Sequence, residues 1–172
     1  PMFSLGFGFV EVGTITPIAQ KGNAKPRIFR LEEDNAIINS LGFNNIGVKK
    51  AKKNISKLKS RFSENRIIGV NLGKNKNSTN PIDDYLYGME QLGNLANYIT
   101  INISSPNTKG LRNLQLKGNI ENLIKQIVLK RSEIESINKK PIFIKISPDL
   151  NDEQLRDIAL MSLANNVNGL II

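Results

Sequence analysis

The sequence contains no cysteine and no histidine. Without cysteine there can be no disulfide, no thiolate metal site and no cysteine nucleophile. Without histidine the chain lacks the commonest general base and the commonest metal ligand of proteins. Acid–base chemistry would therefore have to use serine, threonine, lysine, tyrosine or a carboxylate, and the sequence predicts no metal site.

Long apolar runs are also missing. No run of about eighteen apolar residues occurs, so no segment is expected to span a bilayer, and no signal peptide is recognisable. The chain starts at Pro1, and residues 169–172 have the pattern of a strand that is just beginning. We therefore expect the 172 residues to be an internal segment of a larger protein.

A net charge of +9 stands out in an otherwise ordinary globular composition. Much of it lies in residues 48–66, where apolar residues recur at spacings of three and four. This pattern predicts an amphipathic helix with a solvated basic face. The alternative is a surface that contacts nucleic acid or an anionic membrane. A nucleic-acid-binding module is disfavoured because aromatic stacking residues and recognised motifs are lacking there.

Short β-branched runs alternate with amphipathic segments along the chain, and an irregular segment is expected at 16–34. The expected strands are 9–15, 66–72, 98–103 and 141–146, with a further strand beginning at 169. The expected helices are 35–41, 48–62, 82–94, 119–137 and 152–164. The last helix has Asn151 as N-cap and Gln154 as its capping-box partner. Hydrophobic strands separated by helices predict a parallel sheet.

Two folds have this alternation, the doubly wound sheet and the (β/α)8 (TIM) barrel. No G-x-G-x-x-G or Walker-type loop follows any strand, which disfavours the nucleotide-binding doubly wound fold. A whole barrel needs about 250 residues. We therefore expect an α/β chain that forms a partial barrel of about five strands.

The most informative segment is 99–108, in which a β-branched run ends in amides, hydroxyls and a proline. Side chains alternate along a strand, so Asn102 and Ser104 are expected to face opposite to the isoleucines beside them. Pro106 then ends strand pairing and stiffens the loop that begins with Ser105.

Polar residues occupy the expected carboxyl ends of the strands, which face the active site in a barrel. They are Thr14, Asn71, Asn102, Ser105, Asn107 and Lys145. Amides both donate and accept, so the set suits a flat heterocycle with alternating N–H and C=O groups. Lys145 is expected to have a negative partner, because burying an unpaired ammonium is unfavourable. A single strand-end asparagine is more often a turn former, and a serine base needs activation by a neighbour.

The sequence closely resembles dihydroorotate dehydrogenases of the quinone-dependent class (class 2). Six segments carry the resemblance in family order and at family-like separations, namely residues 12–17, 25–31, 39–45, 70–75, 102–108 and 145–149. The resemblance implies an FMN-binding (β/α)8 barrel, of which residues 1–172 are expected to be the central part of one catalytic domain. The membrane-docking helices and the later barrel strands of the family would lie outside this segment.

The resemblance also implies a role for each matching residue. Flavin contacts fall on Thr14, Asn71, Asn102 and Lys145. The dihydroorotate pocket falls on Asn39, Ser40, Leu41, Gly42, Phe43, Asn102 and Asn107, with Ser40 where many members carry arginine. Ser105 matches the catalytic base, and Thr108 and Phe43 match residues that support it through a bound water. Arg30 matches an arginine near the quinone tunnel.

The implied reaction is oxidation of (S)-dihydroorotate to orotate in de novo pyrimidine (UMP) synthesis, with FMN as cofactor and a ubiquinone-type quinone as acceptor. Ser105 would take the C5 proton while a hydride passes from C6 to flavin N5. Serine at this position favours the quinone class, because the soluble class uses cysteine. The implied location is peripheral on the inner membrane, cytoplasmic or mitochondrial, and no nucleic acid is involved.

An alternative within the same fold is another FMN-dependent barrel oxidoreductase that acts on a different pyrimidine or enone. We also expect the 172-residue polypeptide on its own to bind no FMN and to be inactive. Its open strand edges would leave the barrel, and with it the phosphate site, incomplete.

Overall fold

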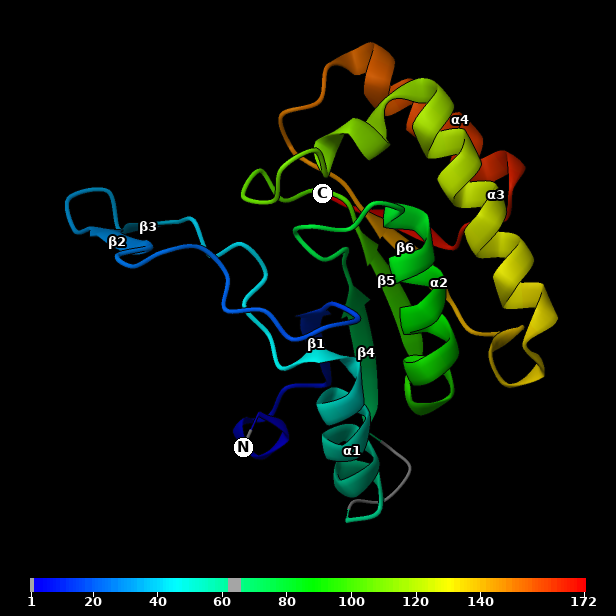
Figure 1. Ribbon diagram of the computed structural model, residues 1–172, viewed down its shortest axis with the longest axis horizontal. Coiled ribbons are helices and arrows are strands. Elements are labelled where there is room, and N and C mark those ends of the chain that lie inside the picture. The colour runs from blue at the N-terminus through cyan, green and yellow to red at the C-terminus, as the bar shows by residue number, and fades with distance from the viewer. Residues whose placement is uncertain (1, 62–65) are drawn as a thin grey trace.

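The computed structural model describes residues 2–61 and 66–172, and its centre is a five-stranded parallel sheet (Figure 1). The strand order is β1-β4-β5-β6-β7. The strands are β1 (Phe9–Ile15), β4 (Ile67–Leu72), β5 (Tyr98–Asn102), β6 (Ile142–Lys145) and β7 (Gly169–Ile171). All four pairings are parallel. The predicted strands are confirmed, with boundaries that differ by a residue or two.

Four α-helices alternate with these strands and lie on one side of the sheet (Figure 1). They are α1 (Gly47–Lys59), α2 (Pro81–Leu92), α3 (Lys117–Glu133) and α4 (Asp152–Ala164). Short 3-10 helices cover Phe3–Leu5, Gly93–Leu95, Arg112–Gln115 and Glu135–Ile137. Helix α4 begins with the predicted capping box, in which Asn151 and Gln154 bond reciprocally.

The one-sided arrangement of the helices distinguishes between the two folds that the sequence left open. In a doubly wound fold helices cover both faces of the sheet, whereas in a barrel they form only the outer ring. In the described part of the chain the other face of the sheet carries no α-helix. Consecutive parallel strands with helices on one face form part of a (β/α)8 barrel, as predicted.

The predicted helix at 35–41 is wrong. An antiparallel hairpin, β2 (Ile28–Leu31) with β3 (Ala36–Asn39), occupies this segment and the end of the stretch expected to be irregular. The β-branched pair in β3 favours a strand, and Asn35 tolerates the left-handed conformation (φ 50°) that the turn requires. All eight strand residues are exposed, and the hairpin projects away from the sheet (Figure 1). Because neither face of the hairpin is buried, hydrophobic periodicity could not predict its two strands.

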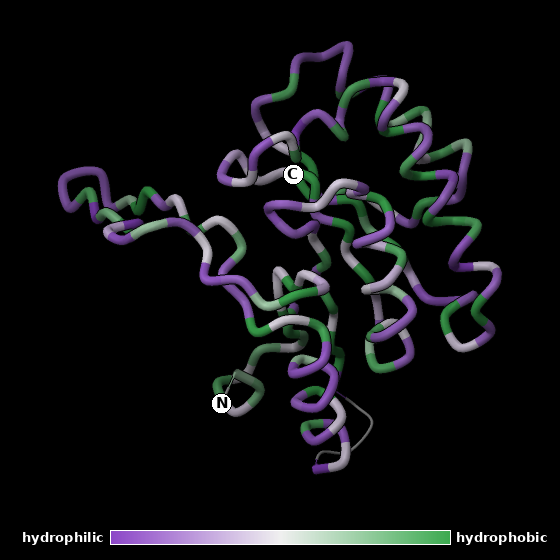
Figure 2. Tube along the Cα trace, viewed as in Figure 1, coloured by the Kyte–Doolittle hydropathy of each residue, from purple (hydrophilic) through white to green (hydrophobic). Residues whose placement is uncertain are grey.

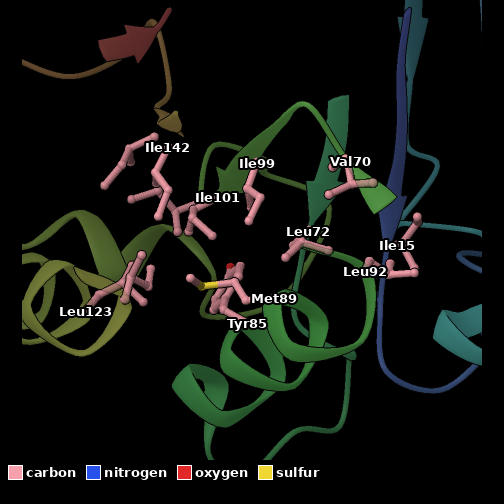
Figure 3. Close-up of a cluster of buried hydrophobic side chains, with 14 of the residues drawn as sticks. Ile15, Val70, Leu72, Tyr85, Met89, Leu92, Ile99, Ile101, Leu123 and Ile142 are labelled. Atoms are coloured by element: carbon pink, nitrogen blue, oxygen red, sulfur yellow. The ribbon is translucent and has the colours of Figure 1, made fainter. Parts of the chain in front are cut away.

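The hydrophobic core lies between the sheet and the helices (Figure 3). Every second residue of a strand faces this side, for example Ile99 and Ile101, which are fully buried. Tyr85 and Met89 of α2 pack against them, and Leu123 of α3 extends the cluster. Figure 2 shows hydrophobic residues along the strands and an alternation of polar and hydrophobic residues along the helices. Because side chains alternate along a strand, the remaining strand residues face the opposite, inner side of the sheet.

The inner face changes from aromatic at the amino ends of the strands to polar at their carboxyl ends. Tyr98 makes edge contacts with Phe9 and Phe143, at centroid distances of 6.4 and 5.4 Å. A Cβ on Gly69 would lie 2.1 Å from the Tyr98 ring, so this glycine makes room for the aromatic cluster. The carboxyl end is left for polar side chains.

The basic segment forms the predicted amphipathic helix. In α1, Val48, Ala51 and Ile55 are buried and Leu58 is partly buried, while the lysines of the helix are exposed. Phe62, the last residue of the predicted helix, lies outside the described residues. The prediction of an amphipathic helix with an exposed basic face is therefore confirmed for α1.

Candidate functional site

A cavity of about 450 Å³ opens at the carboxyl ends of β1, β5 and β6. It brings together most residues of the predicted site from four separate parts of the chain. Its lining residues are Gly13, Thr14, Asn39, Leu41, Gly42, Phe43, Asn44, Asn102, Ser104, Ser105, Pro106, Asn107 and Lys145. Four predicted site residues do not line the cavity: Asn71 and Thr108, which are buried, and Ser40 and Arg30.

Thr14, Asn71 and Asn102 form a hydrogen-bonded cluster on the inner face, called here the amide network. Thr14 Oγ1 donates to Asn71 Oδ1 at 2.7 Å. Asn102 Nδ2 donates to Thr14 Oγ1 at 3.0 Å and to Asn71 Oδ1 at 3.2 Å. Three residues predicted separately as ligands from three strand ends are thus in direct contact.

Asn102 also organises the start of the following loop. Its Oδ1 accepts hydrogen bonds from the backbone nitrogen of Ser104 at 3.1 Å and from Ser104 Oγ at 2.9 Å. The two side chains lie on the same side, and the isoleucines at 101 and 103 are fully buried on the other, as predicted. Lys145 Nζ donates to Ser104 Oγ at 3.3 Å. Within the described part of the chain Lys145 forms no ion pair, so its anionic partner stays a prediction.

The loop after β5 presents Ser105 beside the cavity. Ser105 Oγ accepts a hydrogen bond from the backbone nitrogen of Asn107 at 3.2 Å. The Thr108 hydroxyl is buried and has no hydrogen-bond partner among the described residues. Burying a hydroxyl without a hydrogen-bond partner is energetically unfavourable.

Arg112 holds this loop from outside. Its Nε donates to the carbonyl oxygen of Ser104 at 3.1 Å, and its Nη2 lies 2.8 Å from Asp149 Oδ2. Asp149 belongs to the loop after β6, so the arginine links two neighbouring strand-end loops. Because both side chains of this ion pair are substantially exposed, the pair adds little to the stability of the fold. Its main effect is to fix the relative position of the two loops.

The segment after the hairpin closes the cavity from the other side. Asn107 Nδ2 donates to the carbonyl oxygen of Asn39 at 3.2 Å. Asn23 Nδ2 donates to the carbonyl oxygens of Ser40 and Asn107, at 3.0 and 3.3 Å. These bonds tie the segment to the Ser105 loop. Ser40 thus contributes its backbone here.

Phe43 has an unusual backbone conformation for a bulky residue, with φ at 55°. Its ring packs over Gly73, where a Cβ would lie 2.8 Å from Phe43 Cε2 and 2.6 Å from Thr14 Cγ2. Residues held in such a conformation are often found at functional sites.

Arg30 lies on β2 opposite Ile37 and is exposed on the projecting hairpin. It is the one predicted site residue that belongs to this hairpin's first strand. Several hydrophobic residues of the hairpin are exposed beside it, namely Ile28, Phe29, Leu31, Ile37 and Ile38.

Sequence reasoning did not select Glu11, Gly13, Asn23 or Asn44. The signal that could have identified Glu11 is a carboxylate within a mostly apolar strand. Gly13 approaches Asn71 so closely that a Cβ would lie 2.6 Å from both Asn71 Cβ and Asn71 O. The sequence carries no local signal for Asn23 or Asn44, because their contacts depend on loops that meet only in the folded chain.

The donor set fits a flavin. Neutral amides and hydroxyls along one wall suit the N–H and C=O edge of a planar ring, and a lysine at the end suits a ring that gains negative charge on reduction. Within residues 2–61 and 66–172 no cluster of three acidic residues could hold a metal ion. The site thus combines polar recognition groups with the Ser105 hydroxyl and one cation, Lys145.

Residues 2–172 match the family model described as dihydroorotate dehydrogenase. The chain belongs to the dihydroorotate dehydrogenase family. It is 48% identical to the dihydroorotate dehydrogenase (quinone) of Agrobacterium fabrum, over 100% of this chain and 47% of that protein. It is 47% identical to the enzyme of the same name from Brucella ovis, over 99% of this chain and 47% of that protein. The resemblance to the quinone-dependent class is confirmed.

Solved structures of the family agree with the fold. The dihydroorotate dehydrogenase of Eimeria tenella in complex with ferulenol superposes with a TM-score of 0.86 and 42% identity, over 98% of this chain and 50% of that one. The ligand-free form gives a TM-score of 0.89, also at 42% identity, over 96% of this chain and 51% of that one. The chain thus spans about half the length of its dihydroorotate dehydrogenase relatives. No helix in the described ranges has the length and apolarity needed to cross a membrane.

Proposed function

We propose that this chain supplies the dihydroorotate-oxidising half of a quinone-dependent dihydroorotate dehydrogenase active site. The observation that carries the proposal is the convergence of Ser105, the amide network and Lys145 on one cavity. The product would be orotate, an intermediate of pyrimidine synthesis. Family membership supports the same reaction.

Thr14, Asn71, Asn102 and Lys145 are proposed to hold FMN. When bound there, FMN would supply the two-electron redox chemistry that links dihydroorotate oxidation to quinone reduction. Asn102 has both oxygen bonds committed to Ser104, so its amide orientation is set before any ligand arrives. Preorganised donors of this kind stabilise developing charge without reorganisation.

Ser105 is proposed as the base that takes the C5 proton, with its own hydroxyl proton passing to a bound water. The Asn107 N–H that points at its oxygen stabilises negative charge there once the hydroxyl proton has left. Thr108 and Phe43 are proposed to support Ser105 through a bound water. The buried Thr108 hydroxyl without a partner supports this role, because a water bonded to it would satisfy it.

Dihydroorotate is proposed to lie among the polar groups on the outer side of the cavity. The residues concerned are Asn39, Ser40, Leu41, Gly42, Phe43, Asn102 and Asn107. Asn102 is shared between the amide network and this pocket, so it would sit between flavin and substrate. Holding the substrate between base and flavin would provide much of the rate enhancement by orientation.

A ubiquinone-type quinone is proposed as the electron acceptor, with Arg30 near its site. The exposed apolar side chains beside Arg30 support this placement, since they suit a hydrophobic ligand. Peripheral association of the whole enzyme with the inner membrane would bring it to a lipid-soluble acceptor. No observation favours a nucleic-acid partner.

The Ser105→Ala variant tests the reaction. In the protein made from its natural gene, the variant should lose dihydroorotate oxidation by at least about a hundredfold, since general-base catalysis contributes about 10²–10⁴-fold. Its flavin absorbance should not change. Ser56→Ala, at an exposed position of α1, serves as the matched control. Turnover within about twofold of the natural protein would rule out Ser105 as the base.

A further inference from the structure

A carboxylate lies beneath the amide network on the inner face, and the proposed reaction does not use it. Glu11 on β1 accepts a 2.7 Å hydrogen bond from Asn71 Nδ2 at one oxygen and a 2.7 Å bond from Thr100 Oγ1 at the other. Two donors from two other strands therefore converge on one acidic side chain.

The bonds between Lys145 and Glu11 all run in one direction. Lys145 Nζ donates to Ser104 Oγ, Ser104 Oγ donates to Asn102 Oδ1, and Asn102 Nδ2 donates to Asn71 Oδ1. Asn71 Nδ2 then donates to Glu11 Oε1. An ammonium group can only donate and a carboxylate can only accept. The two charged ends thus determine which group donates at every link between them.

We propose that Glu11 is a positioning residue that sets the amide orientation of Asn71, the asparagine of the amide network that Ser104 does not orient. A side-chain amide has one accepting and one donating end. With Nδ2 held by Glu11, Asn71 Oδ1 must face the donors of Thr14 and Asn102. A flipped Asn71 would place its oxygen against the carboxylate and its NH₂ against the NH₂ of Asn102.

The identity of the ligand as a flavin rests on the proposed function, but the contact between Glu11 and Asn71 does not. Glu11 would not touch the flavin. It would act by presenting the amide network in the one arrangement that matches the ring edge, which avoids reorganisation on binding.

Two substitutions separate an acceptor role from mere space filling. Glu11→Met keeps the length of the side chain and removes every acceptor. Glu11→Gln keeps one oxygen for Asn71, because the hydroxyl of Thr100 can turn to accept from the new amide. Thr100→Val is the matched control, since it removes another donor to Glu11 and leaves Asn71 its acceptor.

The measurement is the FMN dissociation constant of the protein from its natural gene, with circular dichroism to confirm folding. We expect Glu11→Met to weaken FMN binding at least about tenfold, since a charge-assisted bond is lost. Glu11→Gln should weaken it less than about threefold, and Thr100→Val less than about twofold. The proposal is overturned if Glu11→Met binds FMN as the natural protein does, or if Glu11→Gln is as weak as Glu11→Met.

A second measurement needs neither a variant nor a flavin. In NMR spectra of the protein labelled at asparagine with ¹⁵N, one side-chain amide proton of Asn71 should be protected from exchange by its bond to Glu11. Exchange as fast as that of an exposed asparagine would overturn the proposal. If the natural protein binds no FMN, the proposed function fails, and this measurement still decides whether Glu11 orients Asn71.

Discussion

The hydroxyl of Tyr85 donates a 2.9 Å hydrogen bond to the backbone carbonyl of Asn102. Tyr85 belongs to the helix side of the sheet and is fully buried, whereas the side chain of Asn102 faces the cavity. Burial and the nearby Asp84 carboxylate raise the pKa of Tyr85 far above its ordinary value, so the hydroxyl remains a donor. One bond thus joins the hydrophobic core to the candidate site.

Replacing Tyr85 by phenylalanine should lower the free energy of unfolding by about 1–3 kcal/mol, because it leaves a buried carbonyl without its partner. Urea titration measures the change. Tyr87→Phe, on the same helix but exposed, is the control and should change stability by less than about 0.5 kcal/mol. Equal effects of the two substitutions would show that the bond to Asn102 does not stabilise the fold.

Replacing Gly13 by alanine should destabilise the protein by about 1–3 kcal/mol and weaken FMN binding. The new Cβ would lie 2.6 Å from Asn71 Cβ and Asn71 O at a backbone φ of 153°. Gly118→Ala is the control, since nothing lies within 4 Å of its Cβ position. Because Gly118 is in α3, its replacement should stabilise by up to about 1 kcal/mol. Thermal unfolding tests both, and a Gly13→Ala variant of unchanged stability would contradict the close approach.

Tyr98 should make the fold sensitive to alkali. Burial, followed by the charge of the nearby Glu11, raises the pKa of Tyr98 from 10.0 to about 12. Because the folded state holds this proton more tightly than the unfolded state, the stabilisation is complete below pH 10 and is lost as the pH rises from 10 to about 12. Urea unfolding across this window should show a smaller decline for Tyr98→Phe than for the natural protein. Identical slopes for Tyr98→Phe and the natural protein would refute the assignment.

The Ser105→Cys variant tests the proposed base by replacing its hydroxyl with a group of lower pKa. A thiol has an ordinary pKa of about 8.5, far below that of an aliphatic hydroxyl. The variant should retain part of the activity, and the limb of its pH–rate profile that reports the base should move to lower pH. A profile with an unchanged limb would mean that position 105 does not carry the titrating group.

Hydrophobic periodicity located the elements that bury a face. The helix at 152–164 and its capping box appear in the structure at the residues predicted, because cap and periodicity are both local. The hairpin of β2 and β3 was missed because all its strand residues are exposed. For such a segment, pairing between strands decides the structure, and no residue pattern of one strand records it.

The candidate site shows the same division. Alternation along β5 was enough to place Asn102 and Ser104 on one face opposite the isoleucines, and strand ends pointed to Thr14, Asn71 and Lys145. The sequence could not predict which atoms of these side chains are in contact. The bond from Asn71 to Glu11 joins residues 60 positions apart and depends on the register between β1 and β4.

Residue types and their spacing were sufficient for the parallel sheet, the helices on its buried side and the kind of polar group at each strand end, since these follow from burial and from the period of each element. Folding in three dimensions settled the direction of every hydrogen bond from Lys145 to Glu11 and the meeting of the Asn23 and Asn107 loops. Those depend on contacts between distant segments, whose geometry arises only when the strands pair and the loops pack at one end of the sheet.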